Sequence, residues 1–330
     1  MTTVIDVARR AGVSSATVSR VLNGRLTVSA EMRERVNSAV KQLDFRPNPM
    51  AQGLRKGQTN TVALLVGDIA QTHFAELTMQ LQASLEENGI DLLLFNLGHS
   101  ANRLSEFLAR SVSMRLRGVV IALSDTIPKS TTSLFDNLER NGIQVVSIGQ
   151  DLSRYGIRSI VHEERAAAQR SVAYLLAKGH KRIAYVGRIK GSAVGTERFR
   201  GYHAALVNAN AFHEELVWDM AYRYAAGRNA VSRAMDSGLR FTALQAGSDE
   251  IAMGTLAALH DRGRSVPGDV SIVGFGDVQM GAYLRPALTT LSSQPEQAAR
   301  HVCSIFKADG GVEPPMLTVL TRALVQRDSA

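Results

Sequence analysis

The sequence contains a single cysteine, Cys303, among 330 residues. One thiol cannot build a disulfide framework or a cysteine-based zinc site, so the sequence excludes both. No apolar run approaches the roughly twenty residues that a membrane-spanning helix needs, and the N-terminus lacks the pattern of a secretory signal peptide. We therefore expect a cytoplasmic protein with no membrane partner.

Familiar enzyme motifs are also missing. No phosphate-binding loop ends in Gly-Lys-Ser/Thr, and Gly187-Arg-Ile-Lys-Gly191 lacks the spacing of a dinucleotide fingerprint. No G-x-S-x-G nucleophile elbow occurs, and the eight histidines lack the spacing of metal ligands. We predict no catalytic residue, metal or cofactor, and the alternative is a cytoplasmic α/β enzyme that acts on a sugar or nucleotide.

The excess of positive charge is confined to the N-terminal segment. Residues 1–60 contain ten Lys or Arg and four Asp or Glu, so they supply +6 of the chain's net charge of +8. A localised basic segment on a nearly neutral body indicates a polyanionic partner. A membrane-binding segment would need a broad apolar face with aromatic residues, and Phe45 is the only aromatic residue in this segment.

Residues 3–24 predict two short helices joined by a tight turn. Thr3 lies three residues before Asp6, which is the spacing of a capping box, and Gly12 supplies a turn with positive φ. Ser14 can cap the second helix, and Asn23-Gly24 can end it. The outward face of this helix suits base edges and phosphates in a DNA major groove, because it carries small polar groups and one cation: Ser15, Ala16, Ser19 and Arg20.

A third helix should follow, capped by Ser29, with apolar residues at helical spacing: Met32, Val36, Val40 and Leu43. Pro47 and Pro49 end it, and residues 50–56 could form about two helical turns. Helices this short are marginal in water. The segment is therefore either a flexible linker or a helix that folds only when docked on DNA.

These motifs resemble those of the lactose-repressor (LacI) family of bacterial transcription regulators. The matching residues are Asp6-Val-Ala, Ala11-Gly-Val-Ser, Thr17-Val-Ser-Arg-Val-Leu-Asn-Gly24, Arg46-Pro-Asn48, Ala51 and Leu54. The resemblance implies a small all-α helix-turn-helix DNA-binding domain over residues 1–47 and a hinge, helical on DNA, over residues 48–60. The DNA-contacting positions that it implies are Thr3, Ser14, Ser15, Ala16, Thr17, Ser19, Arg20, Asn23, Asn48, Ala51 and Leu54.

The resemblance also implies different roles for these residues. Residues 15 and 16 would touch base edges, although plain solvent exposure is the alternative. Arg20 would read a guanine or grip a phosphate, and Thr17 and Ser19 would hold phosphates. Leu54 would be a wedge between base pairs in the minor groove. The alternative for Leu54 is a hydrophobic contact within the hinge, which its polar neighbours make less favourable.

From residue 61 onward, apolar runs alternate with helical patterns, which is typical of parallel sheets covered on both faces. The predicted strands cover residues 62–66, 92–95, 119–123, 145–148, 183–186, 242–245 and 270–275. Helices are expected at residues such as 74–88, 165–178 and 249–262. Several end at a glycine: Gly89, Gly142, Gly179 and Gly263.

This part of the chain is similar to the periplasmic-binding-protein-like core of the same family. The resemblance implies an α/β core of two subdomains with a ligand cleft between them. We place the N-subdomain at about 61–161 and 291–321 and the C-subdomain at about 162–290 and 322–330, with crossings near 161, 291 and 321. Independently, clefts in open α/β sheets form at the carboxyl ends of strands.

The effector-binding positions that the resemblance implies are His73, Phe74, Arg198, Tyr222, Ser248 and Gly276. For Arg198, the alternative is a surface ion pair with Glu197 or another acid. The aromatic residues could be ordinary core residues. Asp249 opens a helix, where a capping role is at least as plausible as ligand contact.

Three departures from the family pattern concern the ligand: Gln71-Thr72 replaces Asn-Pro, Ser248 replaces Asn, and Gly276 replaces Asp. A carboxylate suits a neutral polyol and repels an anion, whereas a guanidinium grips carboxylates and phosphates. Gly276 together with Arg198 therefore favours a sugar acid such as gluconate, with a sugar phosphate second, and the gluconate-responsive branch is a candidate relative. The competing interpretation is that Gly276 makes room for a bulkier neutral sugar.

Together these features predict a sequence-specific, ligand-controlled transcription regulator, most simply a repressor. No heptad segment follows the last predicted strand, so we expect a homodimer formed through the core. A symmetric dimer should bind a palindromic operator in double-stranded DNA.

Overall fold

The computed structural model describes residues 2–22, 28–45, 58–307 and 313–330. Two compact units divide the chain between Thr59 and Asn60. Each unit has its own hydrophobic core.

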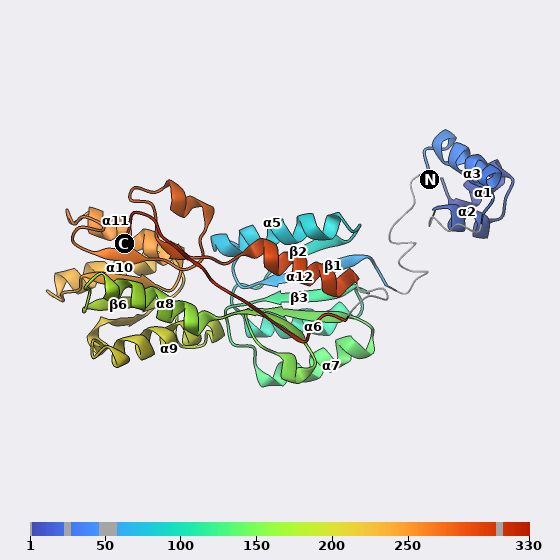
Figure 1. Cartoon of the computed structure of the whole chain (residues 1–330). Coiled ribbons are helices and arrows are strands. Elements are labelled where there is room, and N and C mark those ends of the chain that lie inside the picture. Colours follow the sequence, from blue (N-terminus) through green and yellow to red (C-terminus); the bar gives the residue numbers. More distant parts are fainter. Residues whose placement is uncertain (1, 23–27, 46–57, 308–312) are drawn as a thin grey trace. The chain divides into compact units, whose positions relative to one another are not determined.

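Over residues 2–22, 28–45 and 58–59, the first unit contains three helices (Figure 1): α1 (Val4–Ala11), α2 (Ser15–Leu22) and α3 (Ala30–Gln42). The predicted capping box is confirmed, because Thr3 and Asp6 bond each other through side chain and backbone. The predicted turn is confirmed as well, since Gly12 ends α1 in the left-handed conformation with φ 64°. Ser29 caps α3 by accepting the N–H of Met32.

A small core holds the three helices together. Val7, Val18 and Val36 are fully buried, one from each helix. Met32 shares the helical spacing of the other predicted apolar residues, but its side chain is exposed. Val28, which precedes α3, is buried in this core instead.

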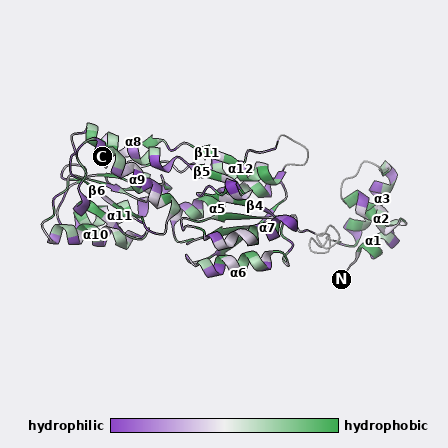
Figure 2. Cartoon of the chain, turned by 90° about the horizontal axis from the view of Figure 1, so that it is seen from below, coloured by the Kyte–Doolittle hydropathy of each residue, from purple (hydrophilic) through white to green (hydrophobic). Residues whose placement is uncertain are grey.

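The second unit has two lobes, each built on a parallel sheet. In the first lobe the strand order is β11-β5-β4-β3-β1-β2. The strands are β1 (Thr61–Val66), β2 (Asp91–Asn96), β3 (Gly118–Ala122), β4 (Gln144–Ile148), β5 (Arg158–His162) and β11 (Leu317–Leu320). The helices are α5 (Thr72–Glu86), α6 (Ala101–Ser111), α7 (Thr132–Arg140) and α12 (Pro295–Lys307). Figure 2 shows hydrophobic residues along the strands and mixed colours on the helices that cover them.

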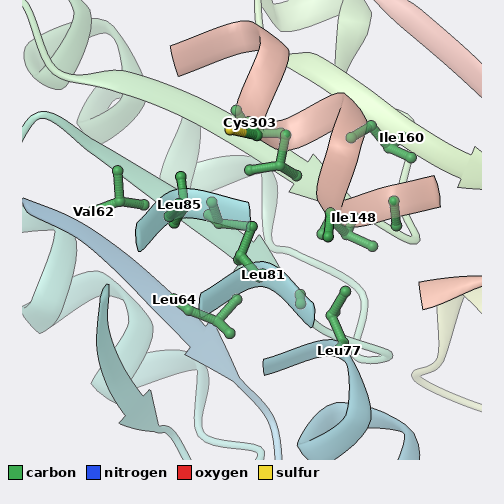
Figure 3. Close-up of a cluster of buried hydrophobic side chains, with 14 of the residues drawn as sticks. Val62, Leu64, Leu77, Leu81, Leu85, Ile148, Ile160 and Cys303 are labelled. Carbon is green, nitrogen blue, oxygen red and sulfur yellow. The ribbon is translucent and has the colours of Figure 1, made fainter. Parts of the chain in front are cut away.

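Alternate residues of β1 serve the two faces of this sheet. Val62 and Leu64 pack against α5 and α12, whereas Leu65 packs against α6 and α7. Figure 3 shows Leu81 of α5 near the β1 side chains of the first cluster. Two covered faces explain why the sequence of β1 is a continuous apolar run.

Cys303 belongs to the same cluster and is 4% exposed. Its Sγ lies 3.2 Å from the carbonyl oxygen of Ser84 and accepts from Asn88 Nδ2 at 3.3 Å. Burial raises the pKa of this thiol. The one cysteine is therefore a packed core residue.

The second lobe has the strand order β7-β6-β8-β9. Its strands are β6 (Ile183–Gly187), β7 (Val217–Asp219), β8 (Ala243–Ala246) and β9 (Ser271–Val273). Helices α8 (Glu164–Ala177) and α9 (Ala193–Asn208) contribute to one hydrophobic cluster on this sheet, and α10 (Tyr224–Asp236) and α11 (Asp249–His260) contribute to another. The short 3-10 helices of the unit are η1 (Lys129–Thr131), η2 (Ser153–Tyr155), η3 (Glu214–Leu216) and η4 (Gln279–Tyr283).

The chain passes between the lobes three times. It leaves the first lobe after β5, returns before α12, and leaves again after β11. An antiparallel pair, β10 (Thr290–Leu291) with β12 (Leu324–Val325), joins the second and third passages. None of the helices that the structure describes has the length and apolarity needed to cross a membrane.

Candidate DNA-binding surface and ligand cavity

One face of helix α2 packs into the core of the first unit, and the opposite face is exposed. Val18 and Val21 are buried, whereas Ser15, Ala16 and Arg20 are exposed on the opposite side. The structure therefore leaves these three side chains available to a ligand outside the unit. Small side chains at the start of the helix let its backbone approach a surface closely.

Other residues that were predicted to contact DNA also make hydrogen bonds within the first unit. The Oγ of Ser14 accepts the backbone N–H of Thr17 at 3.1 Å and lies 2.9 Å from its hydroxyl, so both residues form the N-terminus of α2. The Thr3 hydroxyl donates to Asp6 Oδ2 at 2.7 Å. Hydrogen bonds from Thr3 hold the pKa of Asp6 below its usual value. Ser19 is half-buried on α2.

The turn between α1 and α2 has a partner that the sequence did not indicate. Arg35 of α3 donates from Nη2 to the carbonyl oxygen of Ala11 at 2.6 Å. A Cβ on Gly12 would lie 2.5 Å from the same Nη2. Gly12 is thus required by its backbone conformation and by the room that Arg35 occupies. Asn23, Asn48, Ala51 and Leu54, also predicted to contact DNA, lie outside the described residues.

In the second unit, a cavity of about 80 Å³ lies between the two lobes. Apolar residues and a few polar groups line it, as in most small-molecule sites. Its walls are His73, Phe74, Leu77, Ala122, Leu123, Ser124, Ile148, Gly149, His162, Glu164, Val194, Arg198, Ser293, Pro295, Ala298 and Arg322. A larger groove of about 510 Å³ shares Gly149, His162, Glu164 and Val194 with the cavity.

Arg198 projects from α9 and is buried beside Glu164. Its Nε donates to Glu164 Oε2 at 2.9 Å, and its Nη2 donates to Oε1 at 3.2 Å. Its Nη1 donates to the carbonyl oxygen of Gly247 at 2.6 Å, and its guanidinium carbon lies 4.1 Å from the ring centre of Phe275. The alternative of an ion pair with an acid is thus realised with Glu164, but the pair is buried and not on the surface, and Glu197 pairs with Arg200 instead.

Glu164 is shared with a second arginine. Arg322 Nη2 donates to Glu164 Oε1 at 2.9 Å, and both side chains are buried. Burial raises the pKa of Glu164, but the charges of Arg198 and Arg322 outweigh this and hold the pKa far below its usual range. Glu164 is therefore an ionised carboxylate that two guanidinium groups enclose.

The two histidines of the cavity are uncharged at neutral pH. Burial lowers the pKa of His73 to about 4. Burial, together with the charge of Arg322, lowers the pKa of His162 to about 3, and its Nε2 bonds to the carbonyl oxygen of Ser293 at 2.7 Å. With two arginines and one glutamate, the cavity lining carries a net charge of +1.

Three predicted effector residues do not line this cavity. Tyr222 is buried, with its hydroxyl 3.4 Å from the carbonyl oxygen of Arg188. Ser248 caps α11 by accepting the N–H of Ile251, so the capping role considered for Asp249 belongs to its neighbour. The backbone of Gly276 has φ 147°.

Asp249 has an interior role close to Gly276. Its two oxygens accept from the hydroxyl of Thr290 at 2.5 Å and from the backbone N–H of Val278 at 2.9 Å. Burial raises the pKa of Asp249 to about 6. A Cβ on Gly276 would lie 3.2 Å from Asp249 Oδ2. An aspartate at position 276 would therefore bring a second carboxylate close to a buried one.

Direct bonds hold the lobes together around the cavity. The N–H of Thr72 in the first lobe donates to Glu250 Oε1 in the second at 2.8 Å. Further cross-lobe pairs are Arg188 with Asp125 at 2.5 Å, Arg223 with Asp68 at 2.7 Å, and the N–H of Gln279 with Glu76 at 2.9 Å. The cleft is closed in this structure. No cluster suited to a metal ion occurs among the residues that the structure describes.

Comparisons with known proteins give matches to both units. Residues 3–48 match the family model described as bacterial regulatory proteins, lacI family. Residues 172–330 match the model of a periplasmic binding protein-like domain. These matches follow the division of the chain into a small helical unit and a two-lobed unit.

Two curated proteins of Escherichia coli (strain K12) are similar along the whole chain. The HTH-type transcriptional regulator AscG is 32% identical over 336 residues, which cover 100% of this chain and 98% of AscG. The HTH-type transcriptional regulator GalR is 30% identical over 334 residues, which cover 100% of this chain and 96% of GalR.

Solved structures have the same architecture. A complex of the transcriptional regulator CelR with cellobiose has a TM-score of 0.70 and 27% identity, with full coverage of both chains. A lac repressor dimer bound to operator and an anti-inducer has a TM-score of 0.85 over 99% of this chain and 98% of that one. Its identity of 22% limits that comparison to the fold.

Proposed function

The chain belongs to the lacI family of bacterial regulatory proteins and is a DNA-binding transcription regulator, not an enzyme; from this premise we propose that it is a cytoplasmic repressor whose operator affinity is set by an acidic sugar derivative. The observation that carries the proposal is the cavity between the lobes, whose lining has a net charge of +1.

Helix α2 enters the major groove of the operator. Ser15 and Ala16 meet base edges, and Arg20 bonds to a guanine or a phosphate, because their side chains are exposed on one face. Thr17 and Ser19 hold phosphates, which set the position of the helix without reading sequence. The strong positive charge of residues 1–60 supplies the attraction that does not depend on sequence.

The hinge residues Asn48, Ala51 and Leu54 act in the minor groove. Leu54 wedges between base pairs at the centre of the operator, which favours a pyrimidine–purine step because such steps open easily. By family resemblance that step is CG. Two half-sites related by a twofold axis follow from a symmetric dimer.

The ligand lies in the cavity against the guanidinium groups of Arg198 and Arg322. A guanidinium suits a carboxylate. Gly276 does not line the cavity, so the charge of the lining, and not this glycine, supports the choice of an acidic ligand. The lining differs from a neutral one by a single positive charge, so we favour a sugar acid over a sugar phosphate. CelR holds cellobiose, so a neutral sugar is the competing class.

A thermal-shift panel tests the ligand class. Aldoses, the aldonates made from them, and their phosphates are compared at equal concentrations, because a ligand at a hundredfold excess over its Kd adds about 2.7 kcal/mol of stability. We expect aldonates to raise the Tm and aldoses to leave it unchanged. The opposite result would overturn the acidic ligand. A band-shift assay with palindromic and random DNA tests the operator separately.

An exposed apolar face supports a homodimer formed through the core. Met79 of α5 and Tyr283 of η4 are each 70% exposed, and Leu93 and Leu94 of β2 are also exposed. The bond between Glu76 and Gln279 joins α5 to η4, so Met79 and Tyr283 belong to neighbouring elements of the two lobes. Exposed apolar residues of this kind are typical of an interface, and a twofold pairing covers them on both copies.

A further inference from the structure

Arg322 lies where the three passages between the lobes meet. It belongs to the third passage, and its Nη1 donates to the carbonyl oxygen of Ser292 in the second at 2.9 Å. Its Nη2 bonds to Glu164, which directly follows the first passage. Its backbone N–H donates to Glu163 Oε1 at 3.2 Å. Arg322 thus lies on one crossing and bonds to the other two.

The Nε of Arg322 is buried, and no acceptor from the described part of the chain reaches it. Arg322 also lines the cavity, together with Arg198 and Glu164. A buried donor on a charged group is costly when it lacks an acceptor. An oxygen atom supplied from within the cavity would remove that cost.

The charges around the cavity indicate which kind of ligand would supply this oxygen atom. Arg198 already has a carboxylate partner, since both oxygens of Glu164 accept from it. Arg322 shares only one of those oxygens, so among the residues that line the cavity two guanidinium groups face one carboxylate. The buried carboxylate of Asp249 lies outside the lining and also attracts Arg322, but its two oxygens accept from Thr290 and Val278. The lining itself therefore has one positive charge in excess, which is unfavourable when it is buried. A ligand with one negative charge balances it, whereas a phosphate ester near −2 would place excess negative charge beside Glu164.

We propose that Arg322 is a ligand-binding residue that receives the carboxylate of a monoanionic effector and so determines the charge of the ligand that the cavity accepts. This inference rests on the proposed function and deepens it. Because Arg322 links the three crossings, a ligand that binds to it contacts the segments that connect the lobes and not the surface of one lobe.

The test uses the full-length protein with paired probes of the same carbon skeleton: glucose, gluconate and 6-phosphogluconate, then galactose and galactonate. Titration calorimetry compares the wild type, Arg322→Gln, Arg322→Lys and Arg198→Lys. The control is Arg327→Gln, which removes an arginine of the same segment that pairs with Asp277 outside the cavity. Operator binding without ligand shows that each variant is folded.

We expect Arg322→Gln to weaken aldonate binding at least tenfold while operator binding is kept. Arg322→Lys, which retains the charge and loses the fork of donors, should recover part of that affinity. If Arg322→Gln fails to fold, the lysine variant still tests the role, because it should bind aldonate less tightly than the wild type. Arg327→Gln should bind aldonates as the wild type does.

Two failures are distinguishable. If Arg198→Lys loses aldonate binding while both Arg322 variants keep wild-type affinity, the role of Arg322 is wrong and the acidic effector stands. If the wild type binds aldoses and not aldonates, the acidic effector is wrong and the inference fails with it. If the wild type binds 6-phosphogluconate more tightly than gluconate, the proposed preference for a ligand with one negative charge is wrong.

Discussion

Thr72 and Glu250 are joined across the cleft through the backbone: the N–H that begins α5 donates to a carboxylate of α11 at 2.8 Å. By family resemblance a proline is usual at position 72, and proline has no N–H to donate. This chain therefore has a cross-lobe bond that a proline at the same place could not form.

The substitution Thr72→Pro removes this bond with little other disturbance. Proline is well tolerated at the first position of a helix, and Gln71 already has the extended backbone that proline requires before it. Losing a bond to a charged acceptor costs about 1.5–3 kcal/mol. The affinity of a ligand that needs the closed cleft should fall at least about tenfold. Thr72→Ala keeps the N–H and is the control; equal affinities for the two variants would show that the bond does not support closure.

Substitution of Arg20 separates base reading from charge. Arg20→Lys keeps the cation and loses the two-pronged guanidinium, so the salt dependence of operator binding should change little. Discrimination at one base pair of each half-site should fall by about 1–3 kcal/mol. Band shifts with a library of operators mutated at single positions measure this. Unchanged discrimination with weaker overall binding would identify Arg20 as a phosphate contact only.

The pH dependence of stability should change when His162 is replaced. The pKa of His162 is about 3 in the folded state and 6.5 in the unfolded one, so only the unfolded chain gains this proton between pH 7 and pH 5. Stability therefore falls as the pH falls through this window, by about 2 kcal/mol for one such histidine.

Replacement by His162→Gln keeps a donor for Ser293 and removes the proton site. The variant should lose about 2 kcal/mol less stability than the wild type between pH 7 and pH 5, measured by urea unfolding. Asp249 acts in the opposite direction, because its raised pKa lets the folded state take up a proton first. Asp249 is present in both proteins, so its contribution to the pH dependence of stability cancels in the comparison. Parallel curves for the two proteins would contradict the buried neutral state of His162.

If the exposed apolar residues of the first lobe form the dimer interface, two surface substitutions should have different effects on the oligomeric state. Leu94→Asp places a charge among the exposed apolar residues of β2, and an unpaired charge buried in the interface should disrupt the dimer. Val207→Asp changes a similarly exposed apolar residue on α9 of the second lobe. Light scattering should find monomer for the first and dimer for the second. Dimers in both cases would move the interface elsewhere.

Local signals account for what the sequence predicts well. The caps at Thr3, Ser14 and Ser29 depend on residues three positions apart, and each is present in the structure. Gly89 and Gly263 lie three residues after the ends of α5 and α11 and have positive φ, which glycine adopts without strain. The continuous apolar runs of β1 and β3 reflect sheets buried on both faces.

Elements that rely on distant partners were missed. Strand β5 reads Arg-Ser-Ile-Val-His, and its polar residues hide a strand that pairs with β4 and β11. The strands β10 and β12 have two residues each and exist only through their mutual pairing. No periodicity in a single segment can reveal such strands.

The same limit applies to the cavity. Arg198 lies in a recognisable motif, whereas Glu164 and Arg322 are 158 residues apart and meet only in the folded chain. An acid in the first turn of a helix such as α8 is ordinarily interpreted as a partner of the helix dipole. Burial is what turns Glu164 into the centre of the charged group, and burial follows from packing of the two lobes.

The buried position of Cys303 has a practical consequence for spectroscopy. Its thiol is packed between α5 and α12 and has a raised pKa, so little reactive thiolate is available to a maleimide at neutral pH. The chain thus behaves as a background without reactive thiols, although its natural sequence is intact. One cysteine introduced on each lobe would take one fluorophore of a donor–acceptor pair. Energy transfer between the two fluorophores would then report closure of the cleft as each candidate sugar or sugar acid is added.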